Sequence, residues 1–218
     1  MRKNWAALFD LDGVVIDSSE PHRFAWDILA QREGRVCPQG FFPKSFGMKN
    51  ERVIPELLKW TNDPQEINRL SLEKEAIYRE LISKNGIKTI PGVIDWIKKL
   101  DENSIARAIA SSTIKVNIDC ALNILGIGKY FQAIVSGEDV KKGKPEPEVF
   151  LLAAQRLGRE PKDCVVFEDA HVGIEAGLRA GMKVVALATT HPKQTLKDAH
   201  LVVTDFRELT LADIEALF

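Results

Sequence analysis

The sequence has few cysteines, little excess charge and no long apolar run, and each shortage argues against a class of protein. Its 218 residues include three widely spaced cysteines, Cys37, Cys120 and Cys164, and no Cys-x-x-Cys pair. We therefore expect no disulfide framework and a reducing, cytoplasmic location. The net charge of −1 favours neither nucleic acid nor an anionic membrane as a partner. No stretch approaches the roughly eighteen apolar residues of a membrane helix.

The hydrophobic pattern changes along the chain. Residues 18–86 carry only helical patterns, with helices expected near 19–33, 50–60 and 63–84 and a loop-rich stretch at 36–49. In the first helix, Phe24, Ile28 and Leu29 are expected to face inward. From residue 90 onward, helices alternate with apolar strands, expected at 105–110, 133–135, 164–167, 183–188 and 201–203. This alternation predicts an α/β fold with a parallel sheet covered on both faces.

A further apolar run at 5–9 predicts a strand of the same sheet, so the helical segment is an insertion after it. We expect residues 1–17 and 88–218 to form the core domain and residues 18–87 to form a helical cap. An insertion at the end of that strand is expected over the carboxyl edge of the sheet, where open parallel sheets bind ligands. It is therefore well placed to serve as a lid.

Two carboxylates, Asp10 and Asp12, follow the first strand directly. At i and i+2 of an extended chain they project to the same side, roughly 6–7 Å apart. Two like charges this close favour a nearby cation, and Mg²⁺ prefers carboxylate oxygens while leaving positions for phosphate. Gly13 allows a sharp turn that brings backbone N–H groups near a ligand. Taken alone, this stretch is equally compatible with two solvated aspartates in a loop.

Polar residues also follow the other strands. Ser111 and Ser112 come after the strand at 105–110, and Glu168 and Asp169 end the strand at 164–167. Lys144 lies in a lysine-rich loop before a helix. An attacking carboxylate, a divalent ion and donors for phosphoryl oxygens are the components of phosphoryl transfer. Alternatively, Ser111 caps a helix, Lys144 is a solvated lysine, and the acidic pair complements a helix N-terminus.

These motifs resemble, in order and spacing, those of the haloacid dehalogenase-like (HAD) superfamily. The matching segments are Asp10-Leu11-Asp12-Gly13-Val14-Val15, Ser111, Lys144-Pro145 and Glu168-Asp169. The resemblance implies a Rossmann-like core with an inserted helical cap. It also implies that Asp10 is a nucleophile and that Asp12 is a general acid and base. Ser111 and Lys144 would hold the phosphoryl oxygens.

The resemblance further implies a Mg²⁺ cofactor. Its expected ligands are Asp10, the main-chain carbonyl of Asp12, and Asp169, with Glu168 in or just behind that set. Further candidates for contact with the phosphate are Leu11, Gly13 and Ser112. Relatives often carry a hydroxyl residue after the last aspartate, where this chain has Ala170. We therefore expect one supporting hydrogen bond to be absent or supplied by water.

The cap resembles that of the β-phosphoglucomutase and sugar-phosphate phosphatase branch. His22 lies where such mutases couple lid closure to chemistry, although it is equally compatible with an exposed residue on a first helical turn. Lys49 and Asn50 lie in the segment 46–52, which aligns with a substrate loop. Asn50 stands where a mutase has an arginine for a second phosphate, which favours a phosphatase.

We therefore expect a monomeric, Mg²⁺-dependent phosphatase of a small phosphorylated metabolite. The substrate class is a sugar phosphate or a ribityl or flavin-type phosphate, because residues 47–51, with the region of Trp60 after them, also resemble flavin-pathway phosphatases. A β-phosphoglucomutase is the alternative enzyme. A non-catalytic relative that binds a phosphorylated ligand is the third hypothesis, and the paired Asp10 and Asp12 argue against it.

Overall fold

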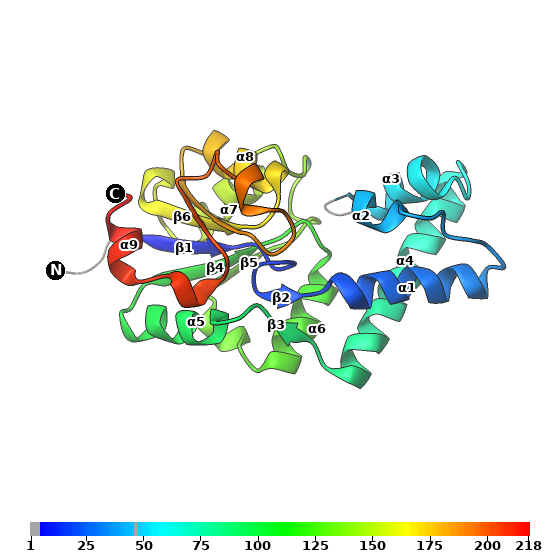
Figure 1. Ribbon diagram of the computed structural model, residues 1–218, viewed down its shortest axis with the longest axis horizontal. Coiled ribbons are helices and arrows are strands. Elements are labelled where there is room, and N and C mark those ends of the chain that lie inside the picture. Colours follow the sequence, from blue (N-terminus) through cyan, green and yellow to red (C-terminus); the bar gives the residue numbers. More distant parts are fainter. Residues whose placement is uncertain (1–4, 46–47) are drawn as a thin grey trace. The chain divides into compact units, whose positions relative to one another are not determined.

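The structure is a computed structural model that describes residues 5–45 and 48–218 (Figure 1). The chain divides into two compact units, Met1–Asp17 with Lys88–Phe218, and Ser18–Ile87. We call them the core unit and the cap unit and describe each by itself. Among the described residues, no helix combines the length and apolar character that a membrane span requires.

The core unit is built on a six-stranded parallel sheet in the order β5-β4-β1-β6-β7-β8. Its strands are β1 (Ala6–Phe9), β4 (Ala106–Ala110), β5 (Ala133–Val135), β6 (Cys164–Glu168), β7 (Lys183–Leu187) and β8 (Leu201–Val203). All neighbouring pairs run parallel. The predicted α/β fold class is therefore confirmed, and β1 lies inside the sheet, between β4 and β6.

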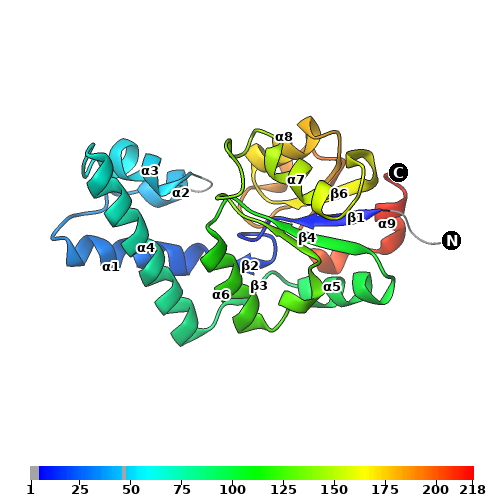
Figure 2. The same ribbon diagram turned by 180° about the vertical axis from the view of Figure 1, so that it is seen from behind.

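Helices cover both faces of this sheet. They are α5 (Val93–Glu102), α6 (Lys115–Leu125), α7 (Glu148–Arg156), α8 (His171–Arg179) and the short C-terminal α9 (Leu211–Glu215). Helices α5 and α6 lie on one face and α7 and α8 on the other (Figures 1 and 2). Gly177 lets α8 approach the sheet closely, because a Cβ there would lie 2.8 Å from a methyl carbon of Val184.

A short antiparallel ribbon lies where the chain leaves and re-enters the core unit. Strand β2 (Ile16–Asp17) pairs with β3 (Lys88–Thr89). Short 3₁₀ turns complete the core unit at Gly128–Tyr130, Pro161–Asp163, Lys193–Thr195 and Phe206–Glu208. The ribbon thus holds together the two ends of the inserted segment.

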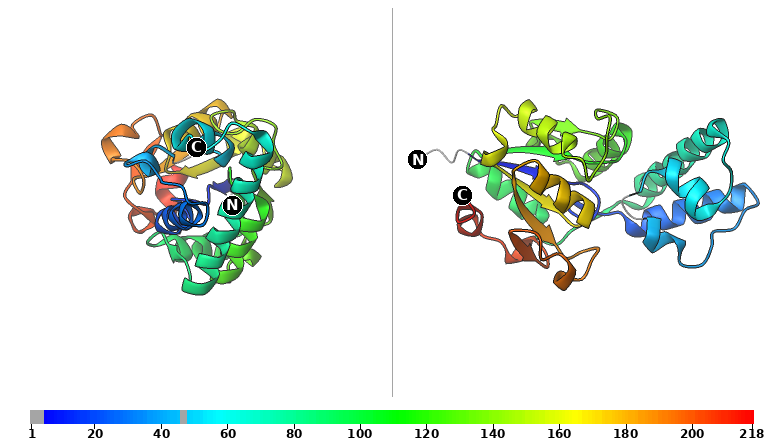
Figure 3. Two further views of the ribbon diagram at one scale, coloured as in Figure 1. Left: turned by 90° about the vertical axis from the view of Figure 1, so that its right-hand side faces the viewer. Right: turned by 90° about the horizontal axis from the view of Figure 1, so that it is seen from above.

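The cap unit is helical, as the pattern predicts. It contains α1 (Ser19–Arg32), α2 (Phe41–Ser45), α3 (Asn50–Arg52), a π-helix (Val53–Leu58) and α4 (Pro64–Asn85). Helix α1 packs along α4 (Figure 3). Asp63 caps α4 by accepting a hydrogen bond from the backbone N–H of Gln65, and Pro64 occupies the first helical position.

One local prediction in the cap unit is wrong. Phe24 does not face inward: it is 40% exposed, and the buried stripe of α1 runs through Ala25, Trp26 and Ala30 together with Leu29, which was predicted to face inward. The helix predicted at 50–60 is present as α3 followed directly by the π-helix, after which Lys59 has φ 54°. The loop-rich stretch at 36–49 contains the short helix α2.

Candidate active site

The candidate site lies at the carboxyl ends of adjacent strands. Phe9 pairs with Phe167 of β6 and with Ile109 of β4, so Asp10 leaves β1 beside Glu168, the last residue of β6. The rings of Phe9 and Phe167 stack at 4.8 Å and are fully buried. The polar residues therefore stand on an apolar, close-packed base that limits the positions their side chains can take.

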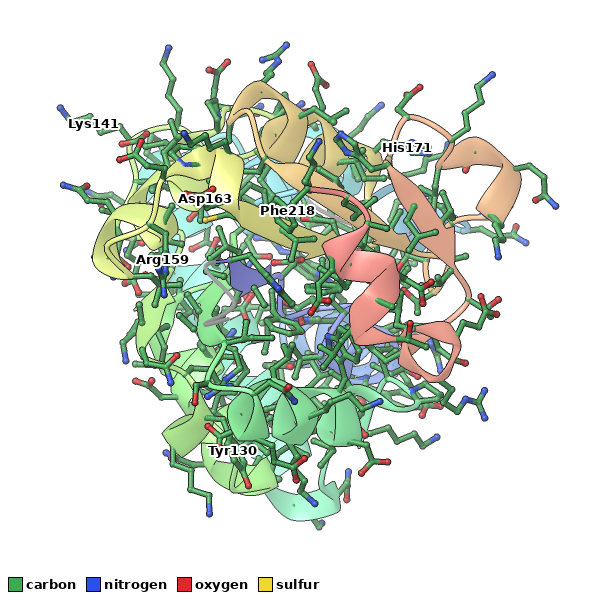
Figure 4. All side chains as sticks on the ribbon, turned by 90° about the vertical axis from the view of Figure 1, so that its left-hand side faces the viewer. Tyr130, Lys141, Arg159, Asp163, His171 and Phe218 are labelled. Carbon is green, nitrogen blue, oxygen red and sulfur yellow. The ribbon has the colours of Figure 1, made fainter. Side chains whose placement is uncertain are left out.

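Lys144 reaches this point from the loop before α7. Its Nζ lies 3.0 Å from Asp10 Oδ1 and 2.5 Å from Glu168 Oε1, and its side chain is only 5% exposed. Lys141, in the same lysine-rich loop, is exposed and points outward (Figure 4). Lys144 is therefore not one of a solvated run, because two carboxylates bury its ammonium group.

Three carboxylates gather around this lysine. Oxygen atoms of Asp10, Glu168 and Asp169 all lie within 4.8 Å of one another. Burial raises the pKa of Asp10 to about 7, with Glu168 and Asp12 adding to the effect against the charge of Lys144. The pKa of Asp169 is also raised, first by burial and then by Glu168 and Asp10. The cluster holds more negative charge than one lysine can offset.

This excess fits a divalent cation that prefers oxygen ligands, such as Mg²⁺. Apart from its ion pair with Lys144, the buried Oδ1 of Asp10 has no hydrogen-bond partner among the described residues. The three carboxylates would form the protein part of such a metal site. The expected contribution of the Asp12 carbonyl stays a prediction.

Glu168 is held in place by the backbone that follows it. Its Oε2 accepts hydrogen bonds from the N–H groups of Asp169, at 2.8 Å, and Ala170, at 3.0 Å. A Cβ at Gly173 would lie 1.8 Å from Glu168 Oε1, so only glycine leaves space for this carboxylate. One oxygen is thus bound by backbone donors while the other meets Lys144.

Thr190 donates a hydrogen bond to Asp169. Its hydroxyl donates to Oδ2 of Asp169 from the loop after β7. The neighbouring Thr189 hydroxyl donates to the carbonyl of Gly13 at 2.6 Å. The expectation that Ala170 leaves one supporting hydrogen bond absent or supplied by water stays a prediction. Sequence reasoning missed these threonines, although two hydroxyl residues after a strand adjacent to β6 are a recognisable signal.

The turn after Asp10 is compact. The N–H of Gly13 donates to the carbonyl of Ile16 at 2.8 Å, and the carbonyl of Leu11 accepts from Val15 and Ile16. Gly13 has φ 75°, and a Cβ there would lie 2.0 Å from Asp169 Oδ2, so this position requires glycine. Asp12 is half-buried in this turn. Its role as acid and base, and phosphate contacts by Leu11 and Gly13, stay predictions.

Ser111 and Ser112 begin the loop after β4. Ser111 is buried, and its hydroxyl accepts a hydrogen bond from the N–H of Thr113 at 3.2 Å. It does not cap the next helix, because the N-cap residue of α6 is Ile114. A Cβ at Gly137 would lie 2.2 Å from the carbonyl oxygen of Ser112, so the loops after β4 and β5 are packed tightly. Phosphate binding by both serines stays a prediction.

The predicted cap residues have different surroundings. Nδ1 of His22 lies 2.7 Å from Lys74 Nζ, and the Asn50 amide donates to Glu75 Oε1 at 2.7 Å. Lys49 is exposed. The predicted substrate loop also includes Phe46 and Gly47, which lie outside the described residues.

Sequence reasoning missed Lys74 and Glu75. Lys74 is buried although it is charged, and it interrupts the apolar stripe of α4 between Leu70 and Ile77. A lysine at an inward position of an amphipathic helix is the signal that could have identified it. The structure thus adds a second buried lysine, in the cap unit, to the one in the core unit.

The sequence is similar to a known protein family and to individual enzymes. The model of a family described as haloacid dehalogenase-like hydrolase matches residues 6–181. A 5-amino-6-(5-phospho-D-ribitylamino)uracil phosphatase of Arabidopsis thaliana is 37% identical over 214 residues, covering 97% of this chain and 57% of its own length. The chain therefore spans little more than half of that relative. The beta-phosphoglucomutase of Bacillus subtilis is 34% identical, covering 94% of this chain and 92% of its own.

A comparison with solved structures gives a similarity to the same family. A HAD hydrolase of family IA, variant 3, from Entamoeba histolytica has a TM-score of 0.89 and 28% identity, covering 98% of each chain. The similarity extends over the core unit and the inserted helical segment alike, because nearly the whole chain is matched.

Proposed function

The chain belongs to the haloacid dehalogenase-like hydrolases, and we propose that within this family it is a Mg²⁺-dependent phosphatase of a small phosphorylated metabolite. The observation that carries the proposal is the buried contact between Asp10 Oδ1 and Lys144 Nζ, beside the carboxylates of Glu168 and Asp169. It supports a nucleophilic carboxylate, a cation for phosphoryl oxygens and a metal-binding oxygen set in one place.

In the proposed reaction, a carboxylate oxygen of Asp10 attacks the phosphorus atom, and the bond from phosphorus to the departing oxygen breaks. Asp12 donates its proton to that oxygen, leaving an aspartyl-phosphate on Asp10. Asp12 then takes a proton from water, whose oxygen attacks phosphorus while the bond from phosphorus to the Asp10 oxygen breaks, which releases inorganic phosphate and restores the Asp10 carboxylate. The Lys144 ammonium and the Ser111 hydroxyl donate to phosphoryl oxygens, where negative charge gathers in the transition state.

Asp10, Glu168 and Asp169 are the residues that would hold Mg²⁺. When bound, the ion would offset the negative charge of these carboxylates and of the phosphate. A pKa of about 7 would leave Asp10 partly protonated at neutral pH. A neighbouring positive charge lowers that pKa and so keeps the nucleophile ionised.

Two observations favour a phosphatase over other reactions of the family. A second carboxylate at Asp12 supplies the acid and base that hydrolysis needs and that halide displacement does not. Asn50 donates to the Glu75 carboxylate and so brings no positive charge for a second phosphate group. The likeness to a phosphatase whose name specifies a ribityl phosphate supports a substrate of that kind or a sugar phosphate. A cytoplasmic location and a monomeric state also stay predictions.

The test is release of inorganic phosphate from p-nitrophenyl phosphate, ribitol 5-phosphate and a panel of sugar phosphates, with and without Mg²⁺. We expect Mg²⁺-dependent turnover that Asp10→Asn abolishes. Turnover that requires no Mg²⁺ and is unchanged in Asp10→Asn would refute the proposal.

A β-phosphoglucomutase is the second candidate, favoured by the similarity to the enzyme of Bacillus subtilis. Conversion of β-glucose 1-phosphate to glucose 6-phosphate would distinguish the two functions. If this conversion is faster than phosphate release from every compound of the panel, the mutase replaces the phosphatase as the proposal.

A further inference from the structure

The loop after β7 is joined to two other segments of the core unit. Strand β7 lies next to β6 and runs parallel to it, so the residues that follow β7 emerge at the sheet edge where Asp169 lies. The hydroxyl of Thr190 donates to Oδ2 of Asp169, and the hydroxyl of Thr189 donates to the carbonyl of Gly13 at 2.6 Å. Two adjacent hydroxyl groups thus connect this loop to a carboxylate of the candidate metal site and to the turn after β1.

The carboxylate of Asp169 is enclosed on two sides. Asp169 is only 4% exposed. A Cβ added at Gly13 would lie 2.0 Å from its Oδ2 and 3.0 Å from Oγ1 of Thr190, so the backbone of Gly13 packs against both groups. The side chain of Thr190 is branched at Cβ, which restricts its rotation. Oδ2 of Asp169 therefore has a fixed place between a glycine backbone and a hydroxyl group.

The hydroxyl group differs in charge from the partner of the other two carboxylates. Oxygen atoms of Asp10 and Glu168 lie 3.0 and 2.5 Å from the ammonium nitrogen of Lys144. A threonine hydroxyl is a neutral donor, so it orients Asp169 without cancelling its charge. Metal ligands in proteins are commonly held by such hydrogen bonds from surrounding residues. An oriented carboxylate that keeps its charge is therefore well suited to binding a cation.

We propose that Thr190 is a positioning residue for the metal site, whose hydroxyl holds the Asp169 carboxylate in the orientation in which it binds Mg²⁺. This role rests on the proposed function, because the Mg²⁺ site is part of it. Thr189 has a different part, since its hydroxyl donates to a backbone carbonyl and anchors the loop on the turn at Gly13. The metal site thus depends on a third segment of the core unit, besides the ends of β1 and β6.

Binding of Mg²⁺ tests this role without any turnover. Calorimetric titration of MgCl₂ into the full chain gives the dissociation constants of wild type and variants. Thr190→Val nearly keeps the shape of the side chain but removes the donor, and we expect it to bind Mg²⁺ about 10–100-fold more weakly. Thr190→Ser retains the hydroxyl and should bind Mg²⁺ within about threefold of wild type.

Thr195→Val is the matched control. Thr195 lies in the same connection between β7 and β8, and its hydroxyl donates to the carbonyl of Pro192 at 2.9 Å. Its removal should leave the Mg²⁺ affinity unchanged. Should Thr190→Val fail to fold, Thr190→Ala also lacks the donor and is expected to give the same loss of affinity.

Two results of the titration would overturn the proposal. The first is a Thr190→Val protein that binds Mg²⁺ as tightly as wild type. The second is a Thr190→Ser protein that binds as weakly as Thr190→Val, because the hydroxyl would then not be the cause.

Kinetics separate loss of the metal from loss of the chemical step. In Thr190→Val, the MgCl₂ concentration that gives half-maximal phosphate release from p-nitrophenyl phosphate should rise by the factor found in the titration. The value of kcat at saturating Mg²⁺ should fall by no more than about threefold. A lower kcat with an unchanged MgCl₂ requirement would show that Thr190 does not act through the metal, and would overturn the proposal.

The wild-type protein distinguishes this role from the proposed function. If wild type binds no Mg²⁺, the proposed Mg²⁺ dependence fails and the role of Thr190 fails with it. If wild type binds Mg²⁺ but releases no phosphate from any compound, the phosphatase is refuted and the titration still decides the role of Thr190. Tight binding that Thr190→Val leaves unchanged removes the role of Thr190 alone.

Discussion

Each unit of the chain buries one lysine against carboxylates, and the two clusters differ in charge balance. In the core unit, Lys144 meets Asp10 and Glu168 while Asp169 adds a third carboxylate. In the cap unit, Lys74 meets one carboxylate, that of Glu75, and a ring nitrogen of His22. The core cluster therefore has excess negative charge, whereas in the cap cluster one lysine faces one carboxylate.

The pKa values follow this difference. The pKa of Asp10 is raised to about 7, because burial and neighbouring carboxylates outweigh one lysine. The pKa of Glu75 is lowered to about 2, because the electrostatic effects of Lys74 and His22 and the hydrogen bonds of Lys74 and Asn50 outweigh burial. A buried lysine thus stabilises a carboxylate fully only where no second carboxylate competes for it. The core cluster is suited to binding a further cation, whereas the Glu75 carboxylate of the cap cluster is already paired with Lys74.

Removing the nucleophile should have the largest effect. Asp10→Asn is expected to lower kcat by ~10⁴-fold or more, since the departing group would have no carboxylate to displace it. The melting temperature should not fall, because the change removes one of three mutually repelling carboxylates. Phosphate release and thermal unfolding are the measurements. Retention of more than about a hundredth of the wild-type rate would contradict the assignment of Asp10.

Removing each lysine compares the two clusters directly. Lys144→Met should lower kcat/KM by ~10²–10³-fold through loss of a transition-state donor, and MgCl₂ should then raise its melting temperature more than that of wild type. Lys74→Met should be destabilised because the buried Glu75 carboxylate loses its lysine partner, but it should respond to MgCl₂ as wild type does. Equal responses in the two variants would remove the proposed distinction in charge balance.

Binding of Mg²⁺ should stabilise the folded protein, with a smaller effect than the losses of activity expected for Asp10→Asn and Lys144→Met. At one hundred times the dissociation constant, Mg²⁺ is expected to add about 2.7 kcal/mol to the free energy of unfolding. Chemical denaturation with MgCl₂ or EDTA measures this term, and EDTA should also stop phosphate release until Mg²⁺ is restored. Asp169→Asn should lose most of the stabilisation, whereas Glu73→Gln should keep it. No difference between MgCl₂ and EDTA would argue against the metal site.

Acid should affect the cap cluster through Glu75. Its pKa is lower in the folded protein than the ordinary 4.5, so the stabilisation is complete above pH 4.5 and is lost as pH falls through about 2. The lowered pKa of Glu75 contributes about 3 kcal/mol at most to the free energy of unfolding. We expect the difference in unfolding free energy between wild type and Glu75→Gln to shrink over that range. A difference independent of pH would show that Glu75 is not held as the ionised partner of Lys74.

Local patterns predicted most of the fold and the composition of the core site. Apolar strands followed by polar residues are local features, which is why Asp10, Ser111 and Glu168 could be expected at one sheet edge. Phe24 was misplaced because helical periodicity defines a face only to within about one position, and in the packing of α1 on α4 the neighbouring Ala25 is buried instead, beside Leu29 as predicted.

The sequence by itself determined the alternating core, the helical insertion and the residue types that follow each strand. Only the tertiary structure decided that Lys144 and not Lys141 is buried, that Thr190 supports Asp169, and that Lys74 meets His22. The physical reason is separation along the chain: Thr190 lies 21 residues from Asp169, and Lys74 lies 52 from His22. Burial and hydrogen bonding depend on such distant partners, and no local pattern specifies them.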